Sequence, residues 1–297
     1  MPGPSGTMAV RGEYQFRIAG RTFDLASRTH VMGILNVTPD SFSDGGRFTS
    51  VASAVDHALG MAEEGADFID IGGESTRPKG TAYGEGAEPV SVQEELDRVL
   101  PVVEALAGKL AVPISVDTYK AGVASRALTA GAAIINDISG FRFDPAMAST
   151  VAGAGATAVV MHIRGTPKTM QDRPVYGDLF GEIIASLSES VRIGREAGIR
   201  QMFVDPGIGF GKTAADNYRL IAGLARFDVL GCPVLIGPSR KSFLAAASGL
   251  GAQNRLEGSI AAAVAAALKG AHVIRVHDVR ETRRALQVAD AISGAEP

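Results

Sequence analysis

The chain has 297 residues, of which 46% are hydrophobic, so it can bury the core of one large α/β domain or of two smaller ones. Its formal net charge of −3 argues against a nucleic-acid-binding protein, because such binding needs clustered positive charge. The single cysteine, Cys232, excludes an internal disulfide and a multi-cysteine metal site, and its place before an apolar run predicts a buried, inert thiol.

The sequence shows no segment that directs the chain to or through a membrane. No stretch reaches the roughly eighteen apolar residues that a membrane-spanning helix needs, and the first residues carry no apolar core of a signal peptide. We therefore expect a soluble, cytoplasmic protein. Residues 1–13 are rich in Pro and Gly and are expected to be disordered.

The first predicted elements are a hairpin and a buried strand. Residues 14–25 alternate apolar and polar side chains, which predicts a β-hairpin. The apolar run Val31–Leu35 predicts a strand that ends at Asn36. Residues 38–46 cannot continue it, because Pro39 has no backbone N–H to donate. A rigid strand followed by a polar loop is typical of an active site in α/β proteins.

From residue 51 onward, predicted helices alternate with short apolar strands. The helices cover residues 51–65, 92–110, 121–130, 145–154, 179–197, 214–224, 242–268 with a break near Gly249, and 279–292. The strands cover residues 68–71, 113–117, 134–137, 157–162, 202–205, 234–236 and 273–275. With Val31–Leu35 this gives eight strand–helix units, which predict a single α/β domain, a closed (β/α)8 TIM barrel, over residues 14–297. A doubly wound open sheet is the alternative, but no GxGxxG turn follows the first strand.

The predicted strands end in polar or ionisable residues, and the C-terminal strand ends are where such barrels carry their function. These residues are Asn36, Asp70, Asp117, Asn136, His162 after Met161, Asp205, Ser239-Arg240-Lys241, and Arg275 with His277. For Asp70 and Asp137 we expect a structural role as helix caps. The number of strand ends that meet at one rim makes a binding site the better interpretation for most of the set.

The residue types indicate the ligand. Asp117, Asn136 and Asp205 suit a flat heterocycle with an aminopyrimidinone edge, because a carboxylate can accept two parallel N–H bonds from it. Lys241 could donate to a ring carbonyl. Arg275 and His277, next to the start of the last helix, predict an anion site.

Three motifs of this sequence resemble the dihydropteroate synthase family: NVTPDSFSDGG at residues 36–46, GGESTRP at 72–78 and DPGIGFGK at 205–212. The resemblance implies a pterin-binding barrel whose bottom is closed by the N-terminal hairpin. It implies an enzyme of folate biosynthesis that condenses 6-hydroxymethyl-7,8-dihydropterin diphosphate with p-aminobenzoate to 7,8-dihydropteroate and pyrophosphate. It also implies Mg²⁺ as cofactor, sulfonamides as inhibitors and a homodimer.

The resemblance assigns roles to individual residues. It implies that the pterin is held by Asp117, Asn136, Met161, Asp205, Lys241 and Arg275. The p-aminobenzoate pocket would be formed by Phe42, Thr76, Pro78, Phe210, Lys241 and Ser242. Pyrophosphate would be bound by Asn36, Arg77, Arg275 and His277, and Mg²⁺ by Asn36. The residues expected to act in catalysis are Asp44, Arg77, Asp117 and Lys241. Met161 could equally be core filling, since Met fills irregular gaps.

Two segments allow interpretations other than the one that the family resemblance implies. Gly211-Lys212-Thr213 looks like the end of a nucleotide-binding Walker A loop, but Pro206 stands where that motif needs Gly, which excludes it. Residues 79–85 are an insertion relative to the family pattern. It is either neutral or a change in the acceptor pocket that alters sulfonamide sensitivity.

Two rival functions remain at the level of sequence. A corrinoid-linked methyltetrahydrofolate methyltransferase of the wider pterin-binding group would not need the anion site at Arg275 and His277. A non-catalytic pterin-binding paralogue would be expected to have lost loop residues such as Asp44 and Arg77, and both are present. The sequence favours catalysis over both.

Overall fold

Eight parallel strands form the centre of the molecule in the computed structural model, which describes residues 11–38, 51–76, 88–172, 174–249 and 255–295. The strands are β3 (His30–Asn36), β4 (Phe68–Gly72), β5 (Ile114–Asp117), β6 (Ile134–Asp137), β7 (Thr157–Met161), β8 (Met202–Asp205), β9 (Leu235–Ile236) and β10 (Val273–Val276). Their order in the sheet is β8-β7-β6-β5-β4-β3-β10-β9. A parallel bridge between Val204 and Val234 joins the two edges, so the sheet closes into a barrel.

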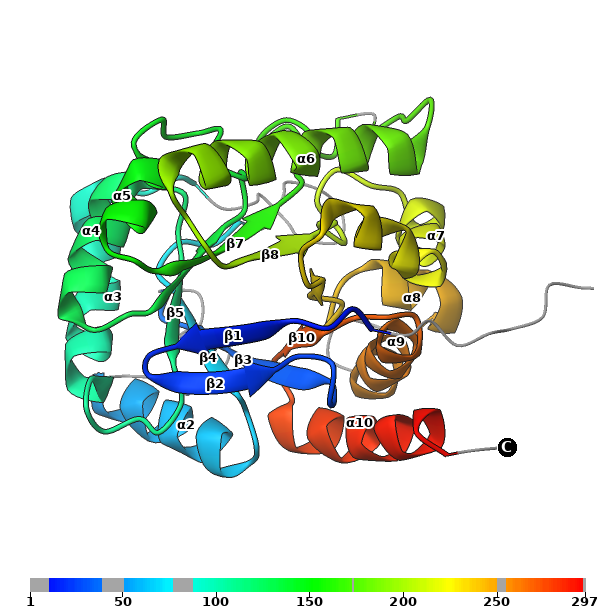
Figure 1. The fold of residues 1–297 in the computed structure, drawn as a ribbon, viewed down its shortest axis with the longest axis horizontal. Coiled ribbons are helices and arrows are strands. Elements are labelled where there is room, and N and C mark those ends of the chain that lie inside the picture. The colour runs from blue at the N-terminus through cyan, green and yellow to red at the C-terminus, as the bar shows by residue number, and fades with distance from the viewer. Residues whose placement is uncertain (1–10, 39–50, 77–87, 173, 250–254, 296–297) are drawn as a thin grey trace, which may run out of the picture.

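Helices surround this barrel on the outside (Figure 1). They are α2 (Val51–Glu63), α3 (Val92–Leu106), α4 (Ala121–Ala130), α5 (Met147–Gly153), α6 (Leu179–Ala197), α7 (Ala214–Ala222), the 3-10 helix η1 (Leu224–Leu230), α8 (Phe243–Ser248), α9 (Leu256–Leu268) and α10 (Val279–Ser293). The predicted (β/α)8 barrel is therefore confirmed.

Two helical elements differ from the prediction. Helix α3 ends at Leu106, before the predicted end at residue 110, because Ala107 takes an extended conformation (ψ 126°) and Gly108 takes φ +75°. The 3-10 helix η1 lies where no element was predicted, and it ends at Gly231 in the left-handed conformation. The extent of the domain and the disorder of residues 1–13 stay predictions. Arg11, the first described residue, already donates a hydrogen bond of 2.6 Å to Asp290.

Alternate residues of each strand face opposite sides of the barrel wall. One set packs against the helices, as Ile69, Ile71 and Val116 do in the largest hydrophobic cluster. The other set faces the interior. At the N-terminal end of the strands this inward set forms an apolar bottom layer of Met32, Phe68, Ile134, Val159, Phe203, Leu235 and Val273.

An antiparallel hairpin, β1 (Gln15–Ile18) with β2 (Arg21–Asp24), closes the bottom of the barrel. Its buried side chains, Phe16, Ile18, Phe23 and Leu25, belong to the same cluster as the bottom layer. The ring centroids of Phe16 and Phe203 are 5.0 Å apart, and those of Phe23 and Phe68 are 4.7 Å apart. Figure 1 shows the blue hairpin lying across the middle of the ring of helices, as predicted.

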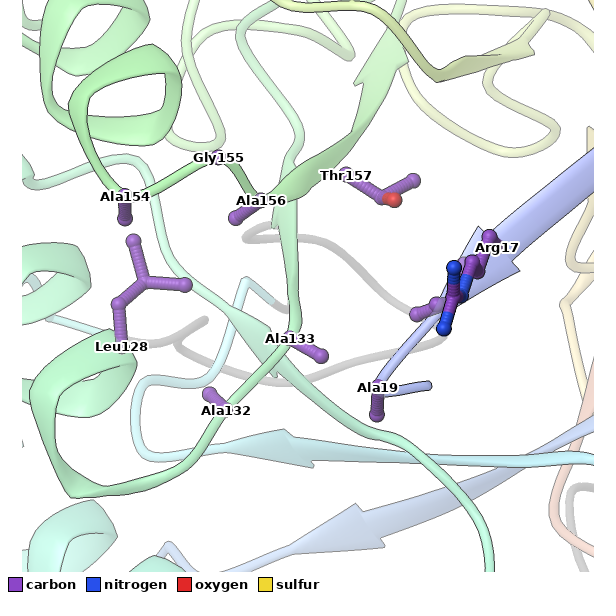
Figure 2. Close-up of a pocket in the computed structure, with 10 residues that line it drawn as sticks. Arg17, Ala19, Leu128, Ala132, Ala133, Ala154, Gly155, Ala156 and Thr157 are labelled. Atoms are coloured by element: carbon purple, nitrogen blue, oxygen red, sulfur yellow. The ribbon is translucent and has the colours of Figure 1, made fainter. Parts of the chain in front are cut away.

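A cavity of about 180 Å³ lies between the hairpin and the starts of β6 and β7 (Figure 2). Its lining includes the small residues Ala19, Ala132, Ala133, Ala154, Gly155 and Ala156, with Arg17 as the charged side chain among the lining residues. Because these residues lie at the N-terminal ends of the strands, the cavity is at the opposite end of the barrel from the polar strand ends.

Three smaller features complete the description of the fold. Cys232 is buried, as predicted, and burial raises the pKa of its thiol. In α9, Ala262, Ala263, Ala266 and Ala267 are buried in the main core, so this face of the Ala-rich helix packs inside the chain. In the part of the chain that the structure describes, no helix combines the length and apolar character needed to span a membrane.

Replacement of Phe16 by Ala should remove about 3–5 kcal/mol from the free energy of unfolding, because the ring fills the interior beneath the barrel. Urea denaturation followed by circular dichroism measures this loss. The matched control is Val229→Ala, whose side chain is 73% exposed and should change stability by less than about 0.5 kcal/mol. A Phe16→Ala protein as stable as the control would contradict the assigned role of the hairpin.

Candidate active site

A polar layer lies directly above the apolar bottom layer. Asp70, Asn136, Asp205 and Arg275 each lie two residues beyond a bottom-layer residue on the same strand, so they also face the interior. Asp117 is paired in register with Asn136 and completes this layer. The C-terminal end of the barrel, here called the mouth, therefore holds the ionisable residues that the sequence placed at the strand ends.

Arg275 is the centre of the polar layer. Its Nε donates to Asp70 Oδ2 at 2.6 Å, and its Nη2 donates to Asp117 Oδ2 at 2.9 Å. Asn136 Nδ2 donates to the same oxygen of Asp70 at 2.9 Å, which turns the amide oxygen of Asn136 away from Asp70. Burial raises the pKa of the Asp117 carboxyl, the nearby Arg275 charge opposes the rise, and the Asp70 charge adds to it.

The two aspartates expected to cap helices differ in the structure. Asp137 has a structural role, but it caps a turn and not a helix: its carboxylate accepts hydrogen bonds from the backbone N–H groups of Ser139 and Phe141 at 2.7 and 2.9 Å, and α5 begins only at Met147. For Asp70 the prediction of a helix cap is wrong. The residue lies inside β4 with no exposed surface, and its partners come from β6 and β10 on either side of the barrel.

Asp205 and Lys241 lie on another part of the same mouth. Asp205 is 6% exposed, and its Oδ1 accepts a bond of 2.6 Å from the N–H of Gly207. Burial raises the pKa of Asp205 to about 6, even though this N–H and the Lys241 charge favour the carboxylate. Burial, followed by the charge of Arg275, lowers the pKa of Lys241 to about 8. Lys241 stays mainly protonated at pH 7 and can still donate hydrogen bonds.

An apolar wall stands beside these charges. Its buried members are Ile138, Met161, Ile163 and Met170, and Tyr119, Phe143 and Phe210 pack against them. The Lys241 ammonium lies 4.0 Å from the centroid of the Phe210 ring, in cation–π contact. Met161 is 4% exposed, so it is packed as a core residue, and contact with a ligand stays a prediction for it.

Three of the residues predicted to bind an anion, Asn36, Arg275 and His277, lie where β3 and β10 end. His277 Nδ1 lies 3.0 Å from Ser239 Oγ. Burial and the charges of Arg240, Arg275 and Lys241 lower the pKa of His277 to about 3, so the ring is neutral at pH 7. Asn36, at the exposed end of β3, has its Oδ1 3.5 Å from the position that a Cβ on Gly72 would take.

The other predicted site residues fall into two groups. Phe42, Asp44, Arg77, Pro78 and the insertion at residues 79–85 fall outside the described residues. Thr76 is half-buried on the segment after β4, and Ser242 directly precedes α8. Within the residues that the structure covers, no group of three or more His, Cys, Asp or Glu side chains is arranged to hold a metal.

Lys212, which imitated a nucleotide-binding lysine in the sequence, is 3% exposed and points away from solvent. Its Nζ lies 3.0 Å from His162 Nδ1 and donates to the carbonyl of Phe210 at 2.9 Å. Burial lowers its pKa to about 7. Lys212 therefore joins the segments after β7 and β8, which agrees with the exclusion of a phosphate loop.

The sequence analysis missed this lysine and a second polar cluster beside the mouth, formed by Glu74, Glu95, Tyr119 and Lys120. It also missed the role of Asp70. For Asp70 a signal was present, because the residue is two positions from Phe68 and from Gly72 and so faces the interior as Asp117 does. No sequence signal indicated the partners of the two lysines.

Comparison with known proteins identifies the relatives of this chain. The family model of pterin binding enzymes matches residues 32–277. The dihydropteroate synthase of Escherichia coli strain K12 is 48% identical over 279 residues, covering 93% of this chain and 96% of that protein.

Solved structures agree. The Yersinia pestis dihydropteroate synthase with a sulfonamide drug complex superposes with a TM-score of 0.88 at 46% identity, covering 95% of this chain and 100% of that one. The Xanthomonas albilineans dihydropteroate synthase in complex with 7,8-dihydropteroate gives a TM-score of 0.83 at 43% identity, covering 95% and 100%. The chain therefore belongs to the family of pterin-binding enzymes and, within it, groups with the dihydropteroate synthases.

Proposed function

We propose that this protein is a dihydropteroate synthase, a transferase that condenses 6-hydroxymethyl-7,8-dihydropterin diphosphate with p-aminobenzoate. The products are 7,8-dihydropteroate and pyrophosphate. The observation that carries the proposal is the polar layer at the barrel mouth, in a chain that resembles dihydropteroate synthases over nearly its full length. A carboxylate pair, an amide and two cations at one end of the barrel suit a polar heterocycle that carries a diphosphate.

The pterin is proposed to lie on the polar layer. The carboxylate of Asp205 and the amide oxygen of Asn136 accept hydrogen bonds from the aminopyrimidinone edge, and Lys241 donates to the ring carbonyl. Asp117 accepts from the other end of the ring, and the side chain of Met161 lies against its face. The support is their common location inside the barrel, with Asn136 oriented by Asp70.

The acceptor p-aminobenzoate is proposed to bind above the pterin, against Phe210. Lys241 lies over that ring, so one ammonium is close to both substrates. Ser242 would hold the carboxylate of the acceptor, and Thr76 would bound the pocket from the segment after β4. Phe42 and Pro78, which lie outside the described residues, complete the proposed pocket.

The diphosphate is proposed to bind at the ends of β3 and β10, to Asn36, Arg77, Arg275 and His277. A neutral His277 can donate one N–H to a phosphate oxygen, and the negative charge of the diphosphate would raise its pKa. Asn36 offers an amide oxygen, a type of ligand that suits Mg²⁺. This oxygen lies near Asp117, since both side chains approach the position that a Cβ on Gly72 would take. Bound Mg²⁺ would supply charge stabilisation for the leaving diphosphate.

The protein's part in the reaction is electrostatic. As the C–O bond to the diphosphate breaks, positive charge grows on the pterin methylene, and negative charge grows on the leaving group. Asp117 stabilises the positive charge, Arg275 and Arg77 stabilise the negative charge, and Asp44 is proposed to add a second carboxylate. The aromatic amine of the acceptor is uncharged at neutral pH, so it attacks the methylene without a strong base.

The rival functions are not favoured. The two solved structures reported above, which align over nearly the whole chain, are dihydropteroate synthases. Inhibition by sulfonamides is proposed from the complex of the Yersinia pestis protein. Assembly into a homodimer and the cytoplasmic location stay predictions from the sequence.

A product assay tests the function directly. Purified protein, hydroxymethyl-dihydropterin diphosphate, p-aminobenzoate and Mg²⁺ should give dihydropteroate and pyrophosphate in equal amounts. EDTA should abolish turnover, and added Mg²⁺ should restore it. Tight pterin binding without product would establish the non-catalytic alternative, and full activity in EDTA would rule out the metal.

Asp117→Ala should lower kcat by at least about a hundredfold, because the carboxylate that faces the developing charge is lost. The kinetic constants of the purified variant provide the measurement. Val229→Ala, on the outside of the barrel, is the control and should retain normal turnover. Near-normal turnover of Asp117→Ala would refute this account of catalysis.

Pterin affinity should depend on pH through Asp205. The pterin binds the carboxylate, and below the pKa of about 6 that group is protonated and cannot accept two N–H bonds. The dissociation constant of 6-hydroxymethylpterin should therefore rise about tenfold from pH 7.5 to pH 5. Titration calorimetry measures it. Asp205→Asn should bind more weakly at pH 7.5 and show a shallower pH dependence, whereas a flat wild-type profile would refute the assignment.

A further inference from the structure

A cluster of charged side chains beside the mouth has no part in the mechanism described above. We call it the Lys120 clamp, and its members are Lys120, Glu74, Glu95 and Tyr119. The Lys120 ammonium donates to Glu74 Oε2 and to Glu95 Oε2, each at 2.6 Å. The Tyr119 hydroxyl donates to Glu74 Oε1 at 2.7 Å. The side chains of Lys120, Glu74 and Glu95 are 14%, 8% and 1% exposed.

The clamp joins three segments that are far apart in the sequence. Glu74 lies just after β4, Glu95 lies in the first turn of α3, and Lys120 lies between β5 and α4. The connection from β4 to α3 begins near Glu74 and ends near Glu95. One ammonium group, that of Lys120, therefore fixes both ends of this connection to the segment after β5. Arg98 adds a hydrogen bond of 2.9 Å to the carbonyl of Gly73, at the start of the same connection.

The clamp stabilises the folded protein less than an apolar cluster of similar size would. Removal of three charges from water is expensive, and the ion pairs repay it only in part. Glu95 Oε1 is buried without a hydrogen-bond partner in the structure, and burial raises the pKa of this carboxyl. Apolar side chains of similar size could hold α3 against the barrel at lower cost. What the charged cluster adds is a single fixed geometry.

The clamp lies close in the chain to two residues that are proposed to contact substrate, Thr76 and Asp117. Thr76 is two residues from Glu74, so its Cα is held within about 7 Å of the clamped residue. Asp117 is three residues before Lys120 on the same strand end. The Tyr119 ring packs edge-on against the Phe143 ring, with 5.5 Å between the ring centroids. Both rings belong to the apolar wall that contains Phe210. The clamp thus connects the segment carrying Thr76 to the wall of the proposed acceptor pocket.

We propose that Lys120 and Glu74 are positioning residues for the acceptor substrate. They hold the start of the β4–α3 connection against the end of β5, so that Thr76 bounds the p-aminobenzoate pocket while the pterin rests on the polar layer. This inference rests on the proposed function. It concerns the acceptor step, since Asp70 and Asp117 of the polar layer are each hydrogen-bonded to Arg275, and the clamp acts on Asp117 through the charge of Glu95.

The test is a comparison of kinetic constants for the two substrates in the purified full-length protein. Lys120→Met should raise KM for p-aminobenzoate about tenfold, while the dissociation constant of 6-hydroxymethylpterin stays within about twofold of wild type. Lys120→Arg, which keeps the charge, should restore KM to within about threefold. Tyr119→Phe removes one hydrogen bond and should give a smaller rise. If Lys120→Met does not fold, Lys120→Met/Glu95→Gln removes the more deeply buried of the two carboxylate charges that the first change leaves unpaired, and this double variant replaces Lys120→Met in the comparison.

A matched control separates positioning from general stability. Arg28 makes a partly buried ion pair with Asp67 at the N-terminal end of the barrel. Arg28→Met should lower Tm and leave both substrate constants unchanged. The proposal is overturned if Lys120→Met lowers Tm with an unchanged KM for p-aminobenzoate, or if pterin binding weakens by the same factor. Absence of product from the wild-type protein would overturn the proposed function first, and this inference with it.

Discussion

The shared guanidinium of Arg275 is the interaction on which the mouth of the barrel depends. Two carboxylates, Asp70 and Asp117, lie inside a closed sheet where an unpaired charge is costly, and Arg275 bonds to both. Asp70 in turn orients the amide of Asn136. The buried cation makes this polar layer possible, and the polar layer gives the heterocycle its proposed orientation. The same burial shifts the pKa values of Asp205 and Lys241 toward neutrality.

Four strands separate stability from chemistry along their length. On β4, β6, β8 and β10 a residue near the N-terminal end packs with the hairpin in an apolar layer, and the residue two positions later carries a charge or an amide group. A step of two keeps both sets on the inner face. The apolar layer therefore supports the charged one from below. These four strands contribute to folding at one end and to the proposed site at the other.

Two lysines, Lys212 and Lys120, hold segments that follow the strands in fixed positions. Lys212 binds the carbonyl of Phe210 and the ring of His162, and Lys120 joins Glu74 to Glu95. Neither is placed to touch the reacting atoms. Both take their partners from different strand–helix units, so each can fix one wall of the mouth relative to another. Lysine suits this task because its ammonium can donate three hydrogen bonds in different directions.

The sequence by itself determined the eight strands, most of their helices, the hairpin and the polar strand ends, because hydrophobic periodicity and turn residues are local signals. Its motifs also pointed to the pterin-binding family. Only the tertiary structure decided that Asp70 pairs with Arg275, 205 positions away, and that Lys120 rather than solvent neutralises Glu74. Such pairs form when the barrel closes and brings distant strand ends together, and no local pattern in the chain records which ends will meet.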